Sequence, residues 1–467
     1  MLTTDDLRVH AGRETGPREP GEFVLYWLQT TMRAGGNPAL TFAIEQANRL
    51  RRPLLVYQGL RPDYPWASDR LHTFILESAL DLSRDFAGRG VQYAFYLDRG
   101  PDTRVAGARS PLVDLAARSA LVVTDFFPTF IVPRQLRALR EKVEPPVIAV
   151  DSCTLVPMRY HGREHSSARS IRPRLLEALP HFLHPVPEAE TEIRATIEVP
   201  FEPVSLGRSS IAALVASCPI DHSVQPSPTI RGGRRAGLAR LASFVAGGLA
   251  RYTEDRNDPN RDATSRLSPY LHFGNVSINE VLLAAREAGP AAEYEKFQDE
   301  ALTWRELAHN FVYHNSRHRT WEAVPEWARS ELDDHRADRR PALYSDLELE
   351  EAGTHDELWN ACQRSLLRDG ELHNYLRMLW GKAVLMWKEK PEDALRVLEH
   401  LNHKYALDGR DPNSYGGIFW CFGKFDRPFY RRPVCGTVRY MSLQAARSKF
   451  DVDKYVARSK GQREKEN

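Results

Sequence analysis

The sequence predicts an α/β domain with a five-stranded parallel, Rossmann-like sheet, followed by an all-α domain. In the first third of the 467 residues, apolar runs alternate with segments of helical spacing, whereas after residue 235 nearly every segment has the helical period of 3.6. A chain of this length also exceeds one ordinary domain. We therefore expect an α/β domain at residues 1–160, an inter-domain connector at 161–235 and a helical domain at 236–467.

The five expected strands are the apolar runs of the first domain, at 23–28, 53–60, 91–97, 120–128 and 146–157. Segments of helical spacing lie between them, at 41–50, 70–86, 111–120 and 133–144. Because parallel strands need crossover connections, this alternation predicts helices on both faces of the sheet. Neither GxGxxG nor GxxxxGK[ST] follows a strand, so a nucleotide site of either kind is not expected in this domain.

Composition narrows the class of protein. The connector is rich in Pro, Arg and Glu, and its periodicity is weak. A net charge of +2 does not by itself indicate a nucleic-acid partner. Five cysteines without a CxxC motif predict reduced thiols, with neither a disulfide framework nor a metal site. No long apolar run and no signal-like N-terminus occur, so we expect a cytoplasmic protein without a membrane partner.

A polar segment at residues 255–275, DRNDPNRDATSRLSPYLHFGN, is a candidate phosphate site. Thr264, Ser265 and Ser268 give three hydroxyls within five residues, beside Arg266 and just before an apolar helical pattern. A hydroxyl-rich turn that enters a helix offers side-chain donors and free backbone N–H groups to a phosphate or pyrophosphate. The alternative is a helix N-cap with arginines facing solvent.

A second candidate site lies in LHNYLRMLWGKAVLMWKEKP. His373, Arg377, Trp380, Val384 and Trp387 recur there at helical spacing and share one face. Such a stripe is usually core. An arginine within it stays charged, however, and its burial requires a carboxylate or phosphate partner.

Possible partners of Arg377 lie in LNHKYALDGRDPNSYGG, where Asn402, Asp408 and Asp411 surround a glycine-rich turn. Sequence spacing also brings acid and indole side chains together elsewhere in the helical domain. Glu300 and Trp304 are four residues apart and share a helix face. A carboxyl group can hydrogen-bond a base edge and an indole can stack on it, although core packing is the alternative for each tryptophan.

These motifs resemble the photolyase and cryptochrome family, most closely the class II cyclobutane pyrimidine dimer photolyases. The blocks RNDPN…LSPYLHFG, WRELAHNF, LWNACQ, LDGRDPNSYGG and RPVCGTVRYM…KFDVDKYV carry the resemblance and span most of residues 250–455. The pair His373-Asn374 departs from the His-Gly usual in class II. The resemblance implies a carbon–carbon lyase in which light excites reduced FAD, FADH⁻, and an electron passes to a dimer flipped out of DNA.

The resemblance also implies which residues hold FAD. Tyr252 lies twelve residues before Thr264, as in the family, and Arg377 and Asp408 would form an ion pair beside the flavin ring with Asn402 facing N5. A nearby cation and amide can stabilise an anionic reduced flavin. The full predicted set is Tyr252, Thr264, Ser265, Arg266, Leu267, Ser268, Arg377, Asn402, Asp408 and Asp411. An antenna chromophore is a further expectation, but the sequence does not identify it.

The lesion pocket implied by the resemblance contains Glu300, Trp304, Met378 and Trp420. Glu300 would be protonated at least transiently and would donate a hydrogen bond to the dimer radical anion. The DNA contacts expected on this basis are Arg256, Asn374 and Arg439. Enzymes that repair (6-4) photoproducts use a pair of histidines, and the matching positions here are Asn374 and Met378.

Electron supply is expected from Trp380, Trp359 and Trp387, which match a family tryptophan relay that photoreduces flavin. The expected partner is dimer-containing DNA, and the expected state is a monomer. Two alternatives remain: a cryptochrome-like blue-light photoreceptor, and a DNA-binding helical protein without enzymatic activity. A photoreceptor often carries a long C-terminal extension, whereas the end KYVARSKGQREKEN is expected to be a short basic tail.

Overall fold

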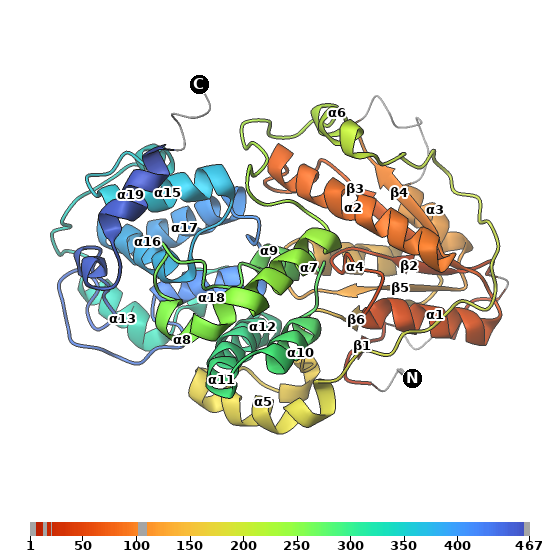
Figure 1. The fold of residues 1–467 in the computed structure, drawn as a ribbon, viewed down its shortest axis with the longest axis horizontal. Coiled ribbons are helices and arrows are strands. Elements are labelled where there is room, and N and C mark those ends of the chain that lie inside the picture. Colours follow the sequence, from red (N-terminus) through yellow and green to blue (C-terminus); the bar gives the residue numbers. More distant parts are fainter. Residues whose placement is uncertain (1–5, 13–15, 20, 101–109, 462–467) are drawn as a thin grey trace.

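The computed structural model describes residues 6–12, 16–19, 21–100 and 110–461, and it contains a mostly parallel sheet beside a helical domain (Figure 1). The last six residues of the basic tail lie outside this described part. The strands are β1 (Val9–His10), β2 (Val24–Trp27), β3 (Leu54–Leu60), β4 (Gln92–Leu97), β5 (Leu121–Phe126) and β6 (Val147–Asp151). Their order is β1-β6-β5-β2-β3-β4, with β1 antiparallel to β6 and the other pairs parallel.

The predicted fold class is confirmed, and each of the five predicted strands is present. The sheet nevertheless has a sixth strand that the sequence analysis missed. β1 contains only two residues, which is too short for an alternating pattern to be recognised. It extends the edge of the sheet beside β6.

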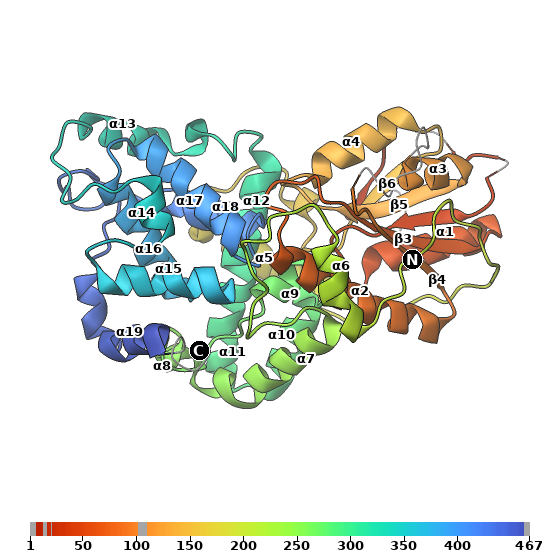
Figure 2. The same ribbon diagram turned by 90° about the horizontal axis from the view of Figure 1, so that it is seen from above.

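Four helices cover the sheet: α1 (Pro38–Leu50), α2 (Asp69–Arg89), α3 (Pro111–Arg118) and α4 (Val132–Lys142). Successive side chains of β2 point to opposite faces, so Val24 packs with α1 and α2 while Leu25 packs with α3 and α4. Figure 2 shows the two pairs of helices on opposite sides of the strands. The strands are buried on both faces, which explains why they read as continuous apolar runs.

The segment predicted as a connector contains two α-helices, α5 (Ala168–Phe182) and α6 (Ile211–Ala216). Helix α5 joins the core of the helical domain, because its Ile171 and Leu175 pack in the same cluster as Leu302. Its periodicity is weak in the sequence since Pro173 and Pro180 lie inside the helix. The domain boundaries at 160 and 235 remain predictions.

The helical domain comprises α7 to α19 and contains two buried clusters. Its helices are α7 (Arg234–Ser243), α8 (Tyr252–Asp255), α9 (Ser268–His272), α10 (Ile278–Ala288), α11 (Ala291–Gln298), α12 (Arg305–His314), α13 (Glu326–Asp334), α14 (Asp346–Glu350), α15 (Glu357–Asp369), α16 (Asn374–Trp387), α17 (Pro391–Tyr405), α18 (Pro412–Cys421) and α19 (Val452–Gly461). A π-helical turn, η6 (Asp299–Trp304), joins α11 to α12. Among the described residues, none of the helices combines the length and apolar character of a membrane span.

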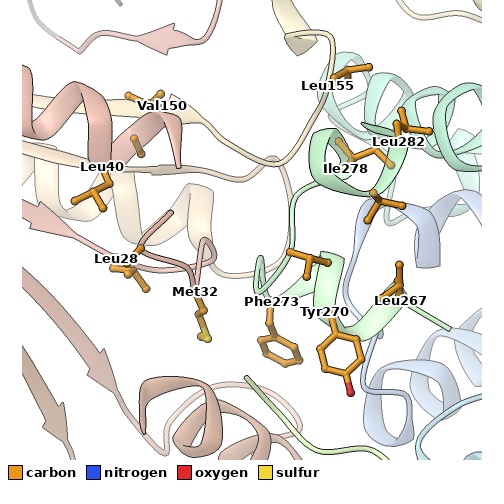
Figure 3. Close-up of a cluster of buried hydrophobic side chains, with 14 of the residues drawn as sticks. Leu28, Met32, Leu40, Val150, Leu155, Leu267, Tyr270, Phe273, Ile278 and Leu282 are labelled. Carbon is orange, nitrogen blue, oxygen red and sulfur yellow. The ribbon is translucent and has the colours of Figure 1, made fainter. Parts of the chain in front are cut away.

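The two domains share a buried core at their junction. Met32 and Leu40 of the sheet domain belong to the same cluster as Tyr270, Phe273 and Ile278 of the helical domain (Figure 3). The backbone N–H of Met32 also donates to the carbonyl of Phe273 at 3.0 Å. This contact holds α9, and with it the hydroxyl-rich loop that precedes α9, against the sheet domain.

Candidate cofactor and substrate cavity

A cavity of about 1010 Å³ lies in the helical domain and brings together most of the predicted cofactor, lesion and DNA residues. Those that line it are Tyr252, Arg256, Thr264, Ser265, Arg266, Leu267, Ser268, Glu300, Trp304, Asn374, Arg377, Met378, Asp408, Asp411, Trp420 and Arg439. They come from segments spread over almost two hundred residues of sequence. The cavity therefore depends on the tertiary fold rather than on any one motif.

The hydroxyl-rich loop forms one wall of this cavity. Arg240 pins its backbone, since Nη2 donates to the carbonyl of Thr264 at 2.7 Å and Nε to that of Ser265 at 2.8 Å. Leu267 is the N-cap of α9 and no side chain caps that helix. The hydroxyls are thus not used as a helix cap. The Arg266 guanidinium pairs with Glu371, which also lines the cavity, and the predicted contact of Arg266 with the cofactor remains untested.

Arg377 and Asp408 form the ion pair that the sequence analysis expected. Arg377 Nη2 lies 3.0 Å from each carboxylate oxygen of Asp408. Arg377 projects from α16 and Asp408 from the turn between α17 and α18, and both side chains are largely shielded from solvent. The Ser414 hydroxyl donates to the Asp408 carbonyl at 2.8 Å, which fixes this turn. A fixed cation and anion pair therefore faces the cavity.

Two other predicted cofactor residues differ in their surroundings. Asn402 is 3% exposed, and the cavity wall, as far as the structure describes it, does not include this residue. Its Nδ2 lies 3.3 Å from His403 Nδ1, and the prediction that it faces N5 remains untested. Asp411 does line the cavity and caps α18. Burial alone would raise the pKa of Asp411, but the hydrogen bond from His272 and nearby cationic groups hold it well below its usual value.

Trp304 and Trp420 form an aromatic wall. Their rings stack with centroids 4.5 Å apart and planes 17° from parallel. Trp304 ends the π-helical turn η6 and Trp420 lies near the end of α18, and both are partly exposed. Met378 reaches the same cavity from α16. A flat apolar surface of this kind can stack on a planar ring.

The Glu300 carboxylate is occupied by two cations. Its Oε1 accepts from Arg256 Nη2 at 2.7 Å and from Lys296 Nζ at 2.8 Å. Arg256 also lies over the Tyr252 ring, 5.5 Å from its centroid. The structure thus pairs a residue predicted to contact DNA with one predicted to contact the lesion. Sequence spacing gave no signal for this pair, because its members are 44 positions apart in the chain.

The other predicted DNA residues lie where the cavity meets solvent. Asn374, in the first turn of α16, and Arg439 are both exposed. Arg439 stacks over Phe429, 5.6 Å from the ring centroid. The neighbouring Tyr430 is 93% exposed. These aromatic side chains were not singled out from the sequence.

The predicted tryptophan relay is a closed cluster. Trp359 lies between the other two, with centroids 6.2 Å from Trp380 and 5.6 Å from Trp387. The three rings are at most 4% exposed. Trp359 Nε1 donates to the Trp380 carbonyl, and Trp380 Nε1 donates to Gln363 Oε1, each at 3.0 Å. The expected adjacency is present, whereas the proposed electron transfer remains a prediction.

Buried polar atoms in the cavity wall indicate that a ligand completes it. Both ring nitrogens of His373 and the Oδ1 of Asn260 are buried, and no described protein group hydrogen-bonds to them. Burial lowers the pKa of His373 to about 4, so its imidazole is neutral near pH 7. Buried polar atoms in native proteins normally have partners. Together with the hydroxyl-rich loop and the Arg377–Asp408 pair, they fit a dinucleotide with a charged ring such as FAD.

No cluster of His, Cys, Asp and Glu in the described ranges has the arrangement of a metal site.

Three residues near the C-terminus also line the cavity, namely Tyr455, Arg458 and Ser459. They lie on α19, far from the recognised phosphate loop in sequence. The sequence analysis missed them because a terminal helix without a motif carries no signal of its contacts.

Comparison with known proteins assigns the chain to a family. Residues 24–191 match the DNA photolyase family. The chain is 35% identical to the deoxyribodipyrimidine photo-lyase of Methanothermobacter thermautotrophicus over 462 residues, which cover 99% of each chain. It is 33% identical to that of Oryza sativa subsp. japonica, covering 97% of this chain and 91% of the relative. The chain therefore belongs to the DNA photolyase family, and its near full-length relatives are named as deoxyribodipyrimidine photo-lyases.

Solved structures share the fold. A class III photolyase from Agrobacterium tumefaciens superposes with a TM-score of 0.67 at 19% identity, over 95% of this chain and 88% of its own. A cryptochrome from Synechocystis sp. PCC6803 superposes with a TM-score of 0.69 at 14% identity, over 94% of this chain and 89% of the cryptochrome chain. At these identities the likeness concerns the architecture of a sheet domain followed by a helical domain.

Proposed function

We propose that this protein is a class II photolyase that uses light to repair cyclobutane pyrimidine dimers in DNA. The observation that carries the proposal is the joining of three features in one cavity: the hydroxyl-rich loop, the Arg377–Asp408 pair and the Trp304–Trp420 stack. The first two suit a flavin dinucleotide and the third suits the linked bases of a pyrimidine dimer. Near full-length relatives named deoxyribodipyrimidine photo-lyase support this reading.

On the cofactor side, FAD in its reduced form supplies, on absorbing light, the electron that opens the cyclobutane ring. Thr264, Ser265 and Ser268 donate hydrogen bonds to its pyrophosphate, and the pinned backbone of their loop keeps these donors in place. Arg377 holds positive charge beside the ring, and Asp408 holds Arg377. A fixed charge of this kind stabilises an anionic ring without reorganisation.

On the lesion side, Trp304, Trp420 and Met378 form a surface that excludes water and stacks on the dimer. Asn374 and Met378 stand where enzymes acting on (6-4) photoproducts would need imidazoles, which favours the dimer as substrate. Glu300 supplies a carboxyl group to the polar edge of the lesion. Electron transfer through Trp380, Trp359 and Trp387 restores the active cofactor state.

On the DNA side, Asn374 and Arg439 contact the backbone around the flipped-out dimer from exposed positions. Such contacts hold a deformed backbone in register but do not read sequence. We infer that the enzyme acts as a monomer in the cytoplasm and that it carries an antenna chromophore of undetermined identity. A photoreceptor of the cryptochrome kind is less favoured, because the near full-length relatives carry the lyase name.

The purified protein tests this proposal in two steps. Its absorption spectrum is expected to show bound flavin, released on denaturation as FAD. Its affinity for a duplex containing one cyclobutane dimer is expected to exceed that for the same undamaged duplex. Absence of flavin would refute the photolyase reading. Bound flavin without any preference for dimer DNA would support the photoreceptor instead.

A further inference from the structure

The ion pair between Arg256 and Glu300 conflicts with the separate roles expected of its members. Arg256 cannot contact a DNA phosphate fully while Nη2 is bound to Glu300 Oε1 at 2.7 Å. The pair lies in the cavity wall, and the side chains of Arg256 and Glu300 are only 16% and 20% exposed. Shielding from solvent strengthens the attraction over that of a surface pair. In the DNA-free protein the Arg256 guanidinium is therefore bound to the Glu300 carboxylate, and neither group is free for DNA or lesion.

The charged and titratable groups around Glu300 come from four elements. Arg256 follows α8, Lys296 lies on α11, Asp299 precedes Glu300 in η6, and Arg172 of α5 pairs with Asp299 at 2.8 Å. Tyr252, on α8, lies beneath Arg256. Oε1 of Glu300 is engaged by both Arg256 and Lys296, and a carboxylate held in this way accepts hydrogen bonds but donates none. Donation to a lesion requires that a cation leave.

We propose that a DNA phosphate displaces Glu300 from Arg256 when lesion DNA binds, and that the released Glu300 then takes a proton from solvent and turns to the lesion. This exchange rests on the proposed function. A phosphate offers a guanidinium the same paired oxygens as a carboxylate. The Tyr252 ring supports the Arg256 side chain 5.5 Å from its centroid, so the guanidinium changes partner over a fixed base. Lys296 stays behind on α11 and keeps Glu300 in the pocket.

The exchange also gives the enzyme a means of discriminating against undamaged DNA. Phosphates of any duplex compete with Glu300 for Arg256, and breaking the ion pair opposes that binding. Only a duplex with a flipped-out dimer offers Glu300 a new hydrogen-bond acceptor in the pocket. Glu300 thus weakens the contact of Arg256 with intact DNA and becomes a lesion ligand on damaged DNA.

Affinity for undamaged duplex DNA isolates the first half of the exchange, since no lesion is present. We expect Glu300→Gln to raise this affinity by about 2- to 5-fold, which is the range for a partly exposed ion pair. Arg256→Met is expected to lower it and to reduce the slope of log affinity against log salt by about 0.9, one phosphate contact. In the Arg256→Met background, Glu300→Gln is expected to add no gain.

Asp299→Asn is the matched control, because it removes the same charge one residue away and frees Arg172, which does not belong to the described cavity wall. It is expected to leave the affinity for undamaged DNA within about 1.5-fold, because Asp299 pairs with Arg172 and not with Arg256. The proposal is overturned if Glu300→Gln gains no affinity, if its gain survives in Arg256→Met, or if Asp299→Asn gains as much.

Proton uptake on binding tests the second half. Calorimetric titration in buffers of different ionisation enthalpy counts protons taken up when dimer DNA binds. We expect uptake in the wild type, so that its affinity for dimer DNA falls as pH rises, and no uptake in Glu300→Gln or with undamaged DNA. Equal uptake in wild type and Glu300→Gln contradicts the exchange. Wild-type protein that binds DNA without preferring the dimer refutes the proposed function instead, which keeps the two failures distinct.

Discussion

Two groups of tryptophans in this molecule have similar ring contacts but opposite surroundings. Trp304 and Trp420 stack at 4.5 Å in the wall of the large cavity, and both remain partly exposed. The Trp359 ring lies 6.2 Å from Trp380 and 5.6 Å from Trp387 between centroids in a closed core, where the indole N–H groups of Trp359 and Trp380 have fixed acceptors. The first group can meet a ligand, whereas the second can meet only other protein groups.

Helix α16 connects the two groups. Arg377 and Met378 face the cavity from this helix, while Trp380 and Trp387 are buried behind them. Arg377 and Trp380 are three residues apart and therefore lie about 60° apart around the helix, so neighbouring positions on one side of α16 differ in their access to the cavity. Clustering of tryptophans alone therefore does not indicate whether they contact a ligand or transfer electrons. Access to the cavity separates the proposed lesion platform from the proposed electron relay.

The largest expected effect is on the closed group. Trp380→Phe is expected to abolish photoreduction of the bound flavin, because it removes the indole of the relay nearest to Arg377 in sequence. Repair by chemically reduced enzyme should be unchanged. Time-resolved absorption under blue light measures photoreduction, and a repair assay measures the activity of the chemically reduced enzyme. Trp321→Phe is a control outside the relay. Photoreduction at the normal rate in Trp380→Phe would leave the cluster a packing element.

Breaking the Arg377–Asp408 pair of the cavity is expected to lower both flavin retention and stability. Arg377→Leu leaves the Asp408 carboxylate without its partner. For a buried pair this lowers the free energy of unfolding by about 3–5 kcal/mol. Flavin content after gel filtration should fall sharply. The double variant Arg377→Leu/Asp408→Leu should recover thermal stability but not flavin retention. Normal flavin content in Arg377→Leu would contradict the assigned role of the pair.

Glu306 tests how firmly the exposed tryptophan group is attached to the sheet domain. Two residues after Trp304, its buried carboxyl accepts the N–H groups of Leu155 at 2.5 Å and Val156 at 3.3 Å. Burial raises the pKa of Glu306 from 4.5 to about 7, partly opposed by Arg305. Between these values the folded state binds more protons than the unfolded state, so stability falls as pH rises from about 4.5 to 7.

The variant Glu306→Gln removes this titration. Between pH 5 and pH 8 the wild type is expected to lose up to about 3 kcal/mol of its free energy of unfolding, the energy of the full pKa shift. Glu306→Gln is expected to show no such loss. Urea unfolding at both pH values measures the difference. The same pH-dependent loss of unfolding free energy in both proteins would show that the pKa of Glu306 is not raised at the junction.

A smaller effect is expected for the stacking platform. Trp420→Ala should weaken binding of dimer-containing DNA by about 1–3 kcal/mol, the range for one base stacked on an aromatic side chain. Flavin content and affinity for undamaged duplex should stay near wild-type values. Fluorescence anisotropy with both duplexes provides the measurement. Equal losses on the two duplexes would mean that Trp420 supports the fold and not the lesion.

Local patterns in the sequence were enough to predict much of the fold. The five long strands follow from apolar runs buried on both faces, and α16 from its helical stripe. Strand β1 could not be predicted because two residues carry no period, and α5 was obscured by Pro173 and Pro180. Regular, long elements leave a periodic signal, and short or interrupted ones do not.

The candidate site was predictable only where a short motif contains its own partners or a resemblance supplies them. Burial of Arg377 predicted an anionic partner, and the resemblance to the photolyase family singled out Asp408. The pairing of Arg256 with Glu300 and of Arg266 with Glu371 was missed, since each joins segments remote in sequence. Which of several charged groups a side chain meets is decided by tertiary packing.

Repair under light decides whether this protein is a photolyase of cyclobutane pyrimidine dimers. Enzyme reduced chemically in the dark is mixed with oligonucleotides that contain either a cyclobutane pyrimidine dimer or a (6-4) photoproduct, and each is then illuminated or kept dark. The account predicts that intact pyrimidines return only from the cyclobutane dimer and only in the light. Repair of the (6-4) photoproduct alone, or of neither lesion under light, would contradict it.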